Sequence, residues 1–410
     1  MAEQAKVPAI RFAGFTDPWE QRKLGDVASS FDYGLNAAAT EYDGQNKYLR
    51  ITDIDDETHE FSKSDLTTPL ADLAMSADYL LKEGDLLFAR TGASVGKTYL
   101  YRQFDGMVYF AGFLIRARIG EGADPEFAYQ ATLTDAYKKY VAITSQRSGQ
   151  PGVNAQEYAD YQLMLPSKTE QQQIGMTLRS LDDLITLHQR KYDKLVIFKK
   201  SMLEKMFPKD GESVPEIRFA GFTDPWEQRE LVDIAEIVGG GTPDTNNSNY
   251  WDGDIDWYAP AELGNNIYAE SSTRKITQAG FDSCSTKMLP ADKTILFTSR
   301  AGIGNTAILR HSACTNQGFQ SLVIGDADVY FVYSMSERIK KWAEEKASGS
   351  TFLEISGRQL ETMPVNLPSL VEQQAIGSFF SHLDDLITLH QRKLELLQNI
   401  KKSLLDKMFV

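Results

Sequence analysis

Gly92–Thr98 (GASVGKT) is the stretch whose residue types and spacing come nearest to a chemical motif. A nucleotide-binding P-loop needs four residues between its glycines so that backbone N–H groups can cradle phosphate. Only three stand there, and the related stretch Arg300–Thr306 (RAGIGNT) lacks the lysine. We therefore expect a glycine-rich β-turn between strands at Leu86–Phe88 and Tyr99–Tyr101. A nucleotide hydrolase that binds ATP through Lys97 is the alternative.

Histidine and aspartate pairs give two further candidates for chemistry. His188 and His390 occupy equivalent places in a repeated segment, and we expect packed or hydrogen-bonded structural histidines rather than catalytic ones. Asp182-Asp183 and Asp384-Asp385 could suggest paired carboxylates for metal or acid–base work. Adjacent residues on a helix do not face each other, so we expect a solvated face or a docking contact.

An internal duplication determines the architecture that must position these residues. Ile10–Arg22 and Ile217–Arg229 share the same thirteen residues, IRFAGFTDPWEQR. Further pairs follow: Leu181–Lys191 recurs at Leu383–Lys393, and Lys199–Phe207 (KKSMLEKMF) returns as Lys401–Phe409 (KKSLLDKMF). The chain is therefore a tandem of two units. The stretches between the shared segments have diverged, which indicates a common fold with different surfaces.

Two long helices are predicted at the ends of the two units. Ser167-x-x-Glu170 and Ser369-x-x-Glu372 are capping boxes, in which the serine hydroxyl and the glutamate carboxylate reciprocally satisfy first-turn N–H groups. Apolar residues then follow in steps of three and four over about 36 residues, which is typical of a helix that packs along a partner helix. Because the other copy is the obvious partner, we expect a coiled-coil pair.

The composition indicates a folded chain that cannot form a single core. Its 410 residues exceed the size at which single cores stop growing, about 250–300 residues. It contains no secretory signal and no long apolar run, so we expect a cytoplasmic protein without a membrane partner. Cys284 and Cys314 fit a reducing compartment, and the five histidines lack metal-ligand spacing. The two cysteines and scattered histidines lead us to expect no metal site.

The net charge of −14 argues against a simple phosphate-binding surface. Residues 24–165 carry 12 basic and 21 acidic side chains, and residues 231–368 carry 11 and 17, so the remainder is close to neutral. We interpret the acidity as a means of solubility that limits non-specific binding. An acidic DNA mimic or a protein–protein scaffold is the alternative.

Several loops combine Arg, Lys, amides and hydroxyls, the groups that contact phosphates and base edges. The turn after Leu86–Phe88 would be a hairpin tip suited to a DNA groove. The candidate DNA-contacting residues in these loops are Lys47, Tyr48, Arg50, Arg90, Ser94, Lys97, Arg147, Gln150, Thr242, Trp257, Tyr258, Ser299, Arg300, Asn305, Gln317, Ser350 and Thr351.

Taken together, these strings resemble the specificity subunit of type I restriction–modification enzymes over nearly the whole chain. The resemblance rests on the duplicated IRFAGFTDPWEQR segment, GGTP at Gly240–Pro243, IDWYAP at Ile255–Pro260, and the glycine loop at Arg300–Gly304. Leu-Pro followed by Glu-Gln-Gln before each predicted helix completes it. The first unit lacks a GGTP string at the corresponding place.

The resemblance implies a mixed α/β fold in which two target recognition domains with β-rich cores are separated by two long, conserved antiparallel helices that form a coiled coil. On this basis we expect a leading segment with the first recognition domain at 1–165 and the first helix at 166–207. A linker at 208–216, a leading segment with the second domain at 217–368 and the second helix at 369–410 complete the chain. The alignable traces between the domains are Phe88 with Phe297, Gly96 with Gly304, and Gly112-Phe113 with Gly318-Phe319.

The resemblance also implies the function and the partners. Each domain would read one half of a bipartite, asymmetric site in double-stranded DNA, and the helices would set the unread gap. The repeated segments would dock two modification subunits, which bind S-adenosylmethionine and methylate adenine, while restriction subunits cut DNA with ATP. The chain itself would be non-catalytic and hold no cofactor, since it contains neither an Asn/Asp-Pro-Pro-aromatic methylase motif nor an intact P-loop.

Overall fold

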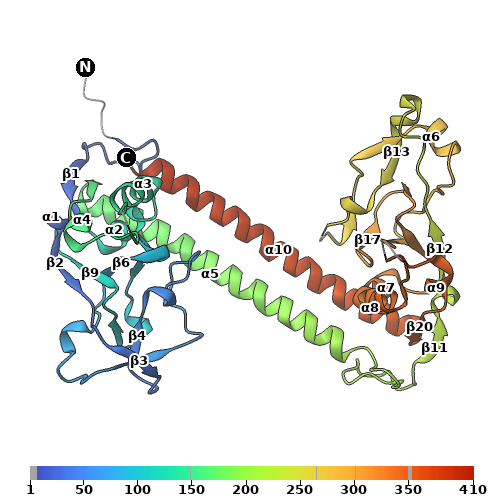
Figure 1. The fold of residues 1–410 in the computed structure, drawn as a ribbon, viewed down its shortest axis with the longest axis horizontal. Helices are drawn as coiled ribbons and strands as arrows, with labels where there is room; N and C mark the ends of the chain where they lie inside the picture. Colours follow the sequence, from blue (N-terminus) through green and yellow to red (C-terminus); the bar gives the residue numbers. More distant parts are fainter. Residues whose placement is uncertain (1–6, 148, 265, 301, 350–352) are drawn as a thin grey trace. The chain divides into compact units, whose positions relative to one another are not determined.

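The computed structural model describes residues 7–147, 149–264, 266–300, 302–349 and 353–410. The chain forms two compact units, one made of residues up to 191 together with 390–410 and the other of residues 192–389. Each unit therefore contains parts of both long helices, which Figure 1 draws as continuous coils. Within the described residues, no helix carries enough continuous apolar sequence to span a lipid bilayer.

The first unit is built on a four-stranded sheet of order β2-β9-β6-β7, in which every neighbouring pair is antiparallel. Three two-stranded pairs, β1-β10, β3-β5 and the parallel β4-β8, surround it. Its strands are β1 (Glu20–Lys23), β2 (Ala28–Tyr33), β3 (Ala38–Glu41), β4 (Lys47–Leu49), β5 (Thr67–Leu70), β6 (Asp85–Ala89), β7 (Thr98–Leu100), β8 (Val108–Phe110), β9 (Leu114–Ile119) and β10 (Gln162–Leu165). Its short helices are α1 (Leu24–Val27), α2 (Pro125–Ala131), α3 (Asp135–Thr144) and α4 (Ala155–Ala159), with 3-10 turns at Ile51–Asp53, Ala77–Tyr79, Gly92–Ser94 and Gln103–Asp105.

The second unit contains a five-stranded sheet of order β12-β19-β16-β17-β14, a three-stranded sheet of order β15-β13-β18, and the pair β11-β20. Its strands are β11 (Glu227–Glu230), β12 (Ala235–Gly239), β13 (Trp251–Tyr258), β14 (Tyr268–Ala269), β15 (Arg274–Ile276), β16 (Thr294–Phe297), β17 (Thr306–Leu309), β18 (Cys314–Thr315), β19 (Gln320–Ile324) and β20 (Pro364–Leu367). Its short helices are α6 (Gln278–Asp282), α7 (Val329–Ser334), α8 (Ser336–Lys346) and α9 (Gly357–Glu361), with 3-10 turns at Leu231–Asp233, Ser248–Tyr250 and Pro260–Glu262.

The two units share one topology despite their divergent sequences. The strand orders β2-β9-β6-β7 and β12-β19-β16-β17 correspond strand by strand. A parallel pair accompanies each sheet, β4 with β8 and β13 with β18. The predictions of a mixed α/β fold and of a common fold under different surfaces are therefore confirmed.

The long helices are α5 (Lys168–Lys205) and α10 (Leu370–Met408), close to the predicted bounds. Half of each predicted capping box is present, because the hydroxyl oxygens of Ser167 and Ser369 accept hydrogen bonds from the Glu170 and Glu372 N–H groups at 3.4 and 3.3 Å. The other half of the prediction, in which the glutamate carboxylate accepts a first-turn N–H group, is wrong. Both carboxylates are buried and instead accept bonds from an arginine far away in the sequence.

The repeated leading segments hold the ends of both long helices. Arg11 donates to both carboxylate oxygens of Glu170 at 2.7 and 2.8 Å, and Arg218 does the same to Glu372 at 2.7 Å. The N–H of the preceding isoleucine donates to a carbonyl near the end of the other helix: Ile10 to Lys407 and Ile217 to Lys205, both at 2.9 Å. Ile10 and Arg11, like Ile217 and Arg218, thus connect each leading segment to both long helices.

The Glu-Gln-Gln segment docks each long helix on the β-rich domain of the same unit. The Oε1 atom of Gln171 accepts the Asp124 N–H at 2.8 Å, and that of Gln373 accepts the Asp328 N–H at 3.1 Å. Both aspartates cap a short helix, α2 or α7. The segment therefore fixes the start of a domain helix on the first turn of a long helix.

The helices pack antiparallel, as predicted, and ion pairs join them within each unit. Asp182 of α5 pairs with Lys401 of α10 at 2.5 Å in the first unit, and Lys199 of α5 pairs with Asp384 of α10 at 2.5 Å in the second. The Asp384 carboxylate also accepts the Tyr330 hydroxyl at 2.7 Å. Of the two options expected for these aspartates, a docking contact describes Asp182 and Asp384, and the adjacent Asp183 and Asp385 are exposed.

His188 and His390 meet on the helix seam in the first unit, which confirms the expected structural role. Their Nδ1 atoms lie 2.8 Å apart, so one ring donates and the other accepts. Burial lowers the pKa of both rings, and Lys191 and Lys393 lower it further. The lowered pKa values therefore disfavour protonation of the accepting Nδ1 atom, which would break this hydrogen bond.

We expect acid to loosen the helix pair through these two histidines. Because their folded-state pKa values lie below the ordinary 6.5, the unfolded chain binds protons first as the pH falls. Their contribution to stability is complete above about pH 6.5 and is lost as the pH falls from there toward the folded values. The unfolding temperature of the wild type should thus fall more between pH 7.5 and 5.5 than that of His188→Gln/His390→Gln. Equal slopes in thermal melts would contradict the prediction.

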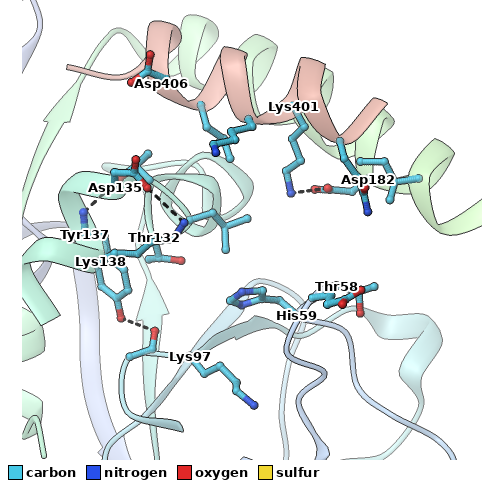
Figure 2. Close-up of a pocket in the computed structure, with 18 of the residues that line it drawn as sticks. Thr58, His59, Lys97, Thr132, Asp135, Tyr137, Lys138, Asp182, Lys401 and Asp406 are labelled. Carbon is cyan, nitrogen blue, oxygen red and sulfur yellow. Dashed lines mark hydrogen bonds and ion pairs between the residues drawn. The ribbon is translucent and has the colours of Figure 1, made fainter. Parts of the chain in front are cut away.

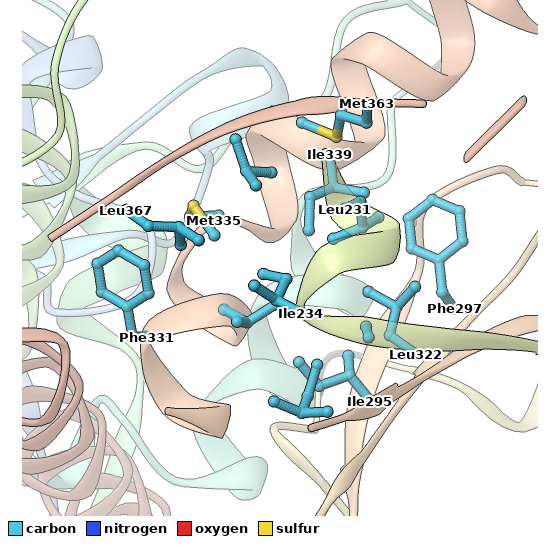
Figure 3. Packing of buried hydrophobic residues seen from close by; sticks show 14 of the residues in the cluster. Leu231, Ile234, Ile295, Phe297, Leu322, Phe331, Met335, Ile339, Met363 and Leu367 are labelled. Carbon is cyan, nitrogen blue, oxygen red and sulfur yellow. The ribbon is translucent and has the colours of Figure 1, made fainter. Parts of the chain in front are cut away.

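A hydrophobic core fills the β-rich domain of each unit. In the second unit, Leu231, Ile295, Phe297 and Leu322 pack against residues of α7 and α8, as Figure 3 shows. Trp226 of the leading segment and Phe207, which follows the end of α5, join the same cluster, with ring centroids 5.8 Å apart. The repeated segments therefore contribute to the core as well as to the helix ends.

The two cysteines should differ in reactivity. Cys314 is fully buried, and burial raises the pKa of its thiol to about 12, whereas Cys284 is partly exposed. Because the thiolate is the reactive form, a disulfide reagent should modify Cys284 in the folded chain and Cys314 only after the domain opens. Spectrophotometric labelling of Cys284→Ser measures Cys314 alone. Rapid labelling of Cys314 at pH 8 without denaturant would refute this.

Candidate nucleic-acid interface

Three loops of the first recognition domain meet at Arg90. The Arg90 N–H donates to the Phe113 carbonyl at 3.0 Å, and the Val153 N–H donates to the Arg90 carbonyl at 2.9 Å. These bonds join the β6–β7 hairpin tip, the β8–β9 turn and the loop before α4. Arg90 and Gln150, which come from two regions chosen from the sequence, thus lie near one junction, where the Gln150 amide lies against Gly92.

The second domain repeats this junction at Ser299. The Ser299 N–H donates to the Gly318 carbonyl at 2.8 Å, and the Ile355 N–H donates to the Ser299 carbonyl at 3.0 Å. The joined loops are the β16–β17 hairpin tip, the β18–β19 turn and the loop before α9. Equivalent loops therefore converge in both domains, although their sequences differ.

Candidate side chains of the first domain gather at its junction. The Arg90 guanidinium lies 4.9 Å from the centroid of the Tyr33 ring. Ser94 lies at the end of the 3-10 turn of the hairpin tip, and the Gln150 amide covers Gly92. Arg147 is exposed and donates to the Thr144 carbonyl at 2.8 Å. Amide, hydroxyl and guanidinium groups thus occur together, as a DNA-reading surface requires.

In the second domain the structure brings Thr242 and Gln317 together through a hydrogen bond between their side chains. Asn305 is exposed at the hairpin tip, and Arg300 of the same tip forms a β-bridge with Glu354. The predicted contacts Ser350 and Thr351 lie outside the described residues.

Four candidates have almost no accessible surface. Tyr48, Trp257, Tyr258 and Ser299 are 2%, 3%, 2% and 0% exposed. The Tyr48 hydroxyl donates to the Leu35 carbonyl at 2.7 Å, and burial raises the pKa of Tyr258. These side chains support the loops from beneath, and a DNA contact by any of them would need local rearrangement.

Arg147 forms an ion pair with Glu157, and three further basic candidates are also held by neighbouring groups. Lys47 donates to the Asp105 carbonyl at 2.5 Å, and Arg50 pairs with Asp53 at 2.7 Å. Lys97 pairs with Asp56 at 2.5 Å and its side chain is 15% exposed. These interactions leave the three side chains less available for phosphate than the sequence suggests.

Lys97 and His59 border a cavity of about 1140 Å³ within the first unit, lined by the domain on one side and by both long helices on the other. Figure 2 shows Lys401 and Asp182 paired across from them. Both lysines and carboxylates line the cavity in similar numbers, so its charge favours no particular ligand.

The glycine loop forms the expected β-turn rather than a P-loop. Gly92–Ser94 is a 3-10 turn, and the chain continues from Lys97 into β7 instead of the helix that a P-loop needs. Gly96 has a φ of +86°, and a Cβ there would lie 2.5 Å from the Val141 side chain. The glycine therefore serves close packing of the tip against α3.

The first domain has a structural counterpart of the GGTP loop that its sequence does not reveal. A Cβ on Gly240 would lie 2.1 Å from the Asn316 carbonyl oxygen, and a Cβ on Gly34 would lie 2.1 Å from that of Ala111. Both glycines permit the same close approach to the turn after the parallel strand. In the first domain, Gly34 is the only sequence mark of this loop, and a single glycine does not identify the loop from the sequence.

Phe113 was not among the sequence-derived candidates, and the predicted alignment of Gly112-Phe113 with Gly318-Phe319 is shifted by one residue. Ala89 pairs with Leu114 where Thr298 pairs with Phe319, so Phe113 corresponds to Gly318. Phe319 is buried, whereas Phe113 is 60% exposed beside Arg90. The Gly-Phe pair in a predicted tight turn is the sequence feature that could have identified Phe113 as a candidate.

Among the described residues, no group of three or more His, Cys, Asp or Glu side chains is arranged to hold a metal ion.

Comparisons with known proteins support the DNA-related interpretation. The family described as type I restriction modification DNA specificity domain matches residues 16–196 and 223–399. The MjaIX specificity subunit of Methanocaldococcus jannaschii is 36% identical over 191 residues, which cover 45% of this chain and 44% of that protein. The putative MjaX specificity subunit of the same organism is 25% identical over 403 residues, covering 95% and 92%.

Solved structures share the fold. The type I restriction–modification S subunit from M. genitalium superposes with a TM-score of 0.65 at 15% identity, covering 98% of this chain and 99% of that one. A chain from a study of complex assembly and conformational transition of the type I system gives a TM-score of 0.50 at 17% identity, covering 97% and 99%.

Proposed function

The chain belongs to the type I restriction modification DNA specificity family, and from this premise we propose that each recognition domain reads one half of a bipartite, asymmetric site in double-stranded DNA. The chain is thus a DNA specificity subunit and not a catalyst. The observation that carries the proposal is the repeated loop junction, at Arg90 in one domain and Ser299 in the other. One scaffold with two different sets of loop side chains suits the reading of two different half-sites.

The long helices would set the number of base pairs left unread between the half-sites. Each helix is continuous through residues of both units, and ion pairs fix its register against the other. A helix of 38 or 39 residues spans about 57 Å, longer than the ~34 Å of one DNA turn.

The duplicated segments would dock two modification subunits. Identical surfaces in the two units, such as the leading segments and Leu181–Lys191 with Leu383–Lys393, suit two copies of one partner. S-adenosylmethionine and ATP would be bound by the modification and restriction subunits, and basic surface on those partners would offset the acidity of this chain.

Mapping modified adenines in DNA treated with the assembled complex tests the proposal. Arg90→Ala/Gln150→Ala should relax the sequence of one half-site, and Asn305→Ala/Gln317→Ala that of the other, because each base contact contributes about 1–3 kcal/mol of discrimination. Lys138→Ala, an exposed residue of the first domain that pairs with Asp135 outside the duplicated segments, is the matched control. A pair of substitutions that changed both half-sites, or neither, would overturn the proposal.

A further inference from the structure

The β8–β9 turn of the first domain and the β18–β19 turn of the second are equivalent but present opposite chemistry. Each is a four-residue turn, closed by the Leu114 N–H on the Ala111 carbonyl at 2.8 Å and by the Phe319 N–H on the Asn316 carbonyl at 3.4 Å. Each also bonds the residue at the loop junction, Arg90 or Ser299. The turns therefore lie at the centre of the two candidate interfaces.

The glycine and the side-chain-bearing residue occupy opposite central positions in the two turns. In the first domain they are Gly112 and Phe113, and in the second they are Gln317 and Gly318. A Cβ on Gly318 would lie 2.6 Å from the Pro260 Cγ atom, so that position has no room for a side chain. The first domain thus presents an aromatic ring where the second presents an amide one residue earlier.

Phe113 has no structural role that explains its exposure. Its side chain is 60% exposed, whereas its neighbour Leu114 is completely buried in the core. Arg90, the residue it bonds through the backbone, stacks on the 44% exposed ring of Tyr33. An apolar ring amid cationic and polar side chains suits a ligand with a charged backbone and one apolar group on its edge.

We propose that Phe113 is a specificity-determining residue that contacts the 5-methyl group of a thymine in the half-site read by the first domain, while Gln317 reads the other half-site through hydrogen bonds. The inference rests on the proposed function. The thymine methyl is the apolar group that base pairs display in a groove, and phenylalanine is among the side chains that contact it. A primary amide instead matches the donor and acceptor of adenine.

Replacing thymines one at a time by deoxyuridine tests this, because deoxyuridine lacks only the methyl group. The assembled complex, with its modification subunits, is titrated against duplexes that carry the mapped site. We expect one substitution in the first half-site to weaken wild-type binding about 3- to 10-fold, the effect of burying one methyl group. The same substitution should leave binding by Phe113→Ala unchanged.

Phe104→Ala is the matched control, since Phe104 is a 66% exposed phenylalanine elsewhere in the same domain and should retain the response to deoxyuridine. Wild-type binding that ignores every deoxyuridine in the first half-site would overturn the proposal, as would a full response in Phe113→Ala. Either result with sequence-specific modification intact leaves the proposed function standing. Loss of all sequence preference in the wild type would instead refute the proposed function itself.

Discussion

Arg218→Met is expected to destabilise the unit formed by residues 192–389 by about 3–5 kcal/mol, the cost of removing one partner from a buried ion pair. The Glu372 side chain is 1% exposed, and both of its oxygens accept hydrogen bonds from Arg218. Methionine retains the apolar stem but leaves the carboxylate buried without its cation. The loss of stability therefore comes more from the unpaired buried carboxylate than from lost packing.

Labelling of Cys314 provides the measurement, because this thiol is buried in the same unit. If labelling requires the unit to open, 3–5 kcal/mol corresponds to a rate about 150- to 5000-fold faster in Cys284→Ser/Arg218→Met than in Cys284→Ser. A chain of two units need not unfold in a single transition, so a local probe is preferable to a global melt.

Two variants control for this result. Arg229→Met removes the exposed pair with Glu227 and should change stability by at most about 1 kcal/mol. Adding Glu372→Gln to Arg218→Met should recover part of the loss, since the amide carries no charge. Labelling at the same rate in Arg218→Met and Arg229→Met would show that the buried pair is unimportant.

The sequence predicts those features of the fold that depend on local pattern or on repetition. The helices α5 and α10 follow from apolar spacing and a serine cap, and the hairpin after Phe88 follows from its glycines between apolar strands. The duplication further indicates that the helices pair with each other. Each of these inferences needs only neighbouring residues or a comparison of the chain with itself.

Contacts between distant residues are what the sequence does not reveal. The capping-box interpretation assigns the Glu170 carboxylate to its own helix, but its partner Arg11 lies 159 residues away. Trp257 appears suited to a DNA-reading loop, yet its indole N–H donates to the Gly241 carbonyl at 2.9 Å and the ring is buried. Side-chain exposure is decided by such tertiary contacts, and polar or aromatic composition alone does not report it.

The position of Phe113 shows that the register of diverged repeats is not fixed by one shared dipeptide. Matching one Gly-Phe pair to the other places a buried core residue, Phe319, opposite an exposed one. The strand register and the bond to Arg90 correct this by one residue. In this turn, a shift of one residue exchanges a buried core side chain for an exposed one.

Inserting four residues into both long helices should lengthen the unread gap by roughly two base pairs. Four helical residues add about 6 Å, and successive base pairs are about 3.4 Å apart. The insertions belong after Lys191 in α5 and before His390 in α10, where the chain passes from one compact unit to the other. Each unit then keeps its own ion pair, Asp182 with Lys401 or Lys199 with Asp384.

The change in gap is measured by mapping modified adenines on random-sequence DNA treated with the assembled complex. The two half-site sequences should stay the same, because neither loop junction is altered. Insertion into α5 alone is the control, since helices of unequal length cannot keep both ion pairs in register and the site preference should be lost. A double insertion that modifies the original site with its original gap would show that helix length does not set the spacing.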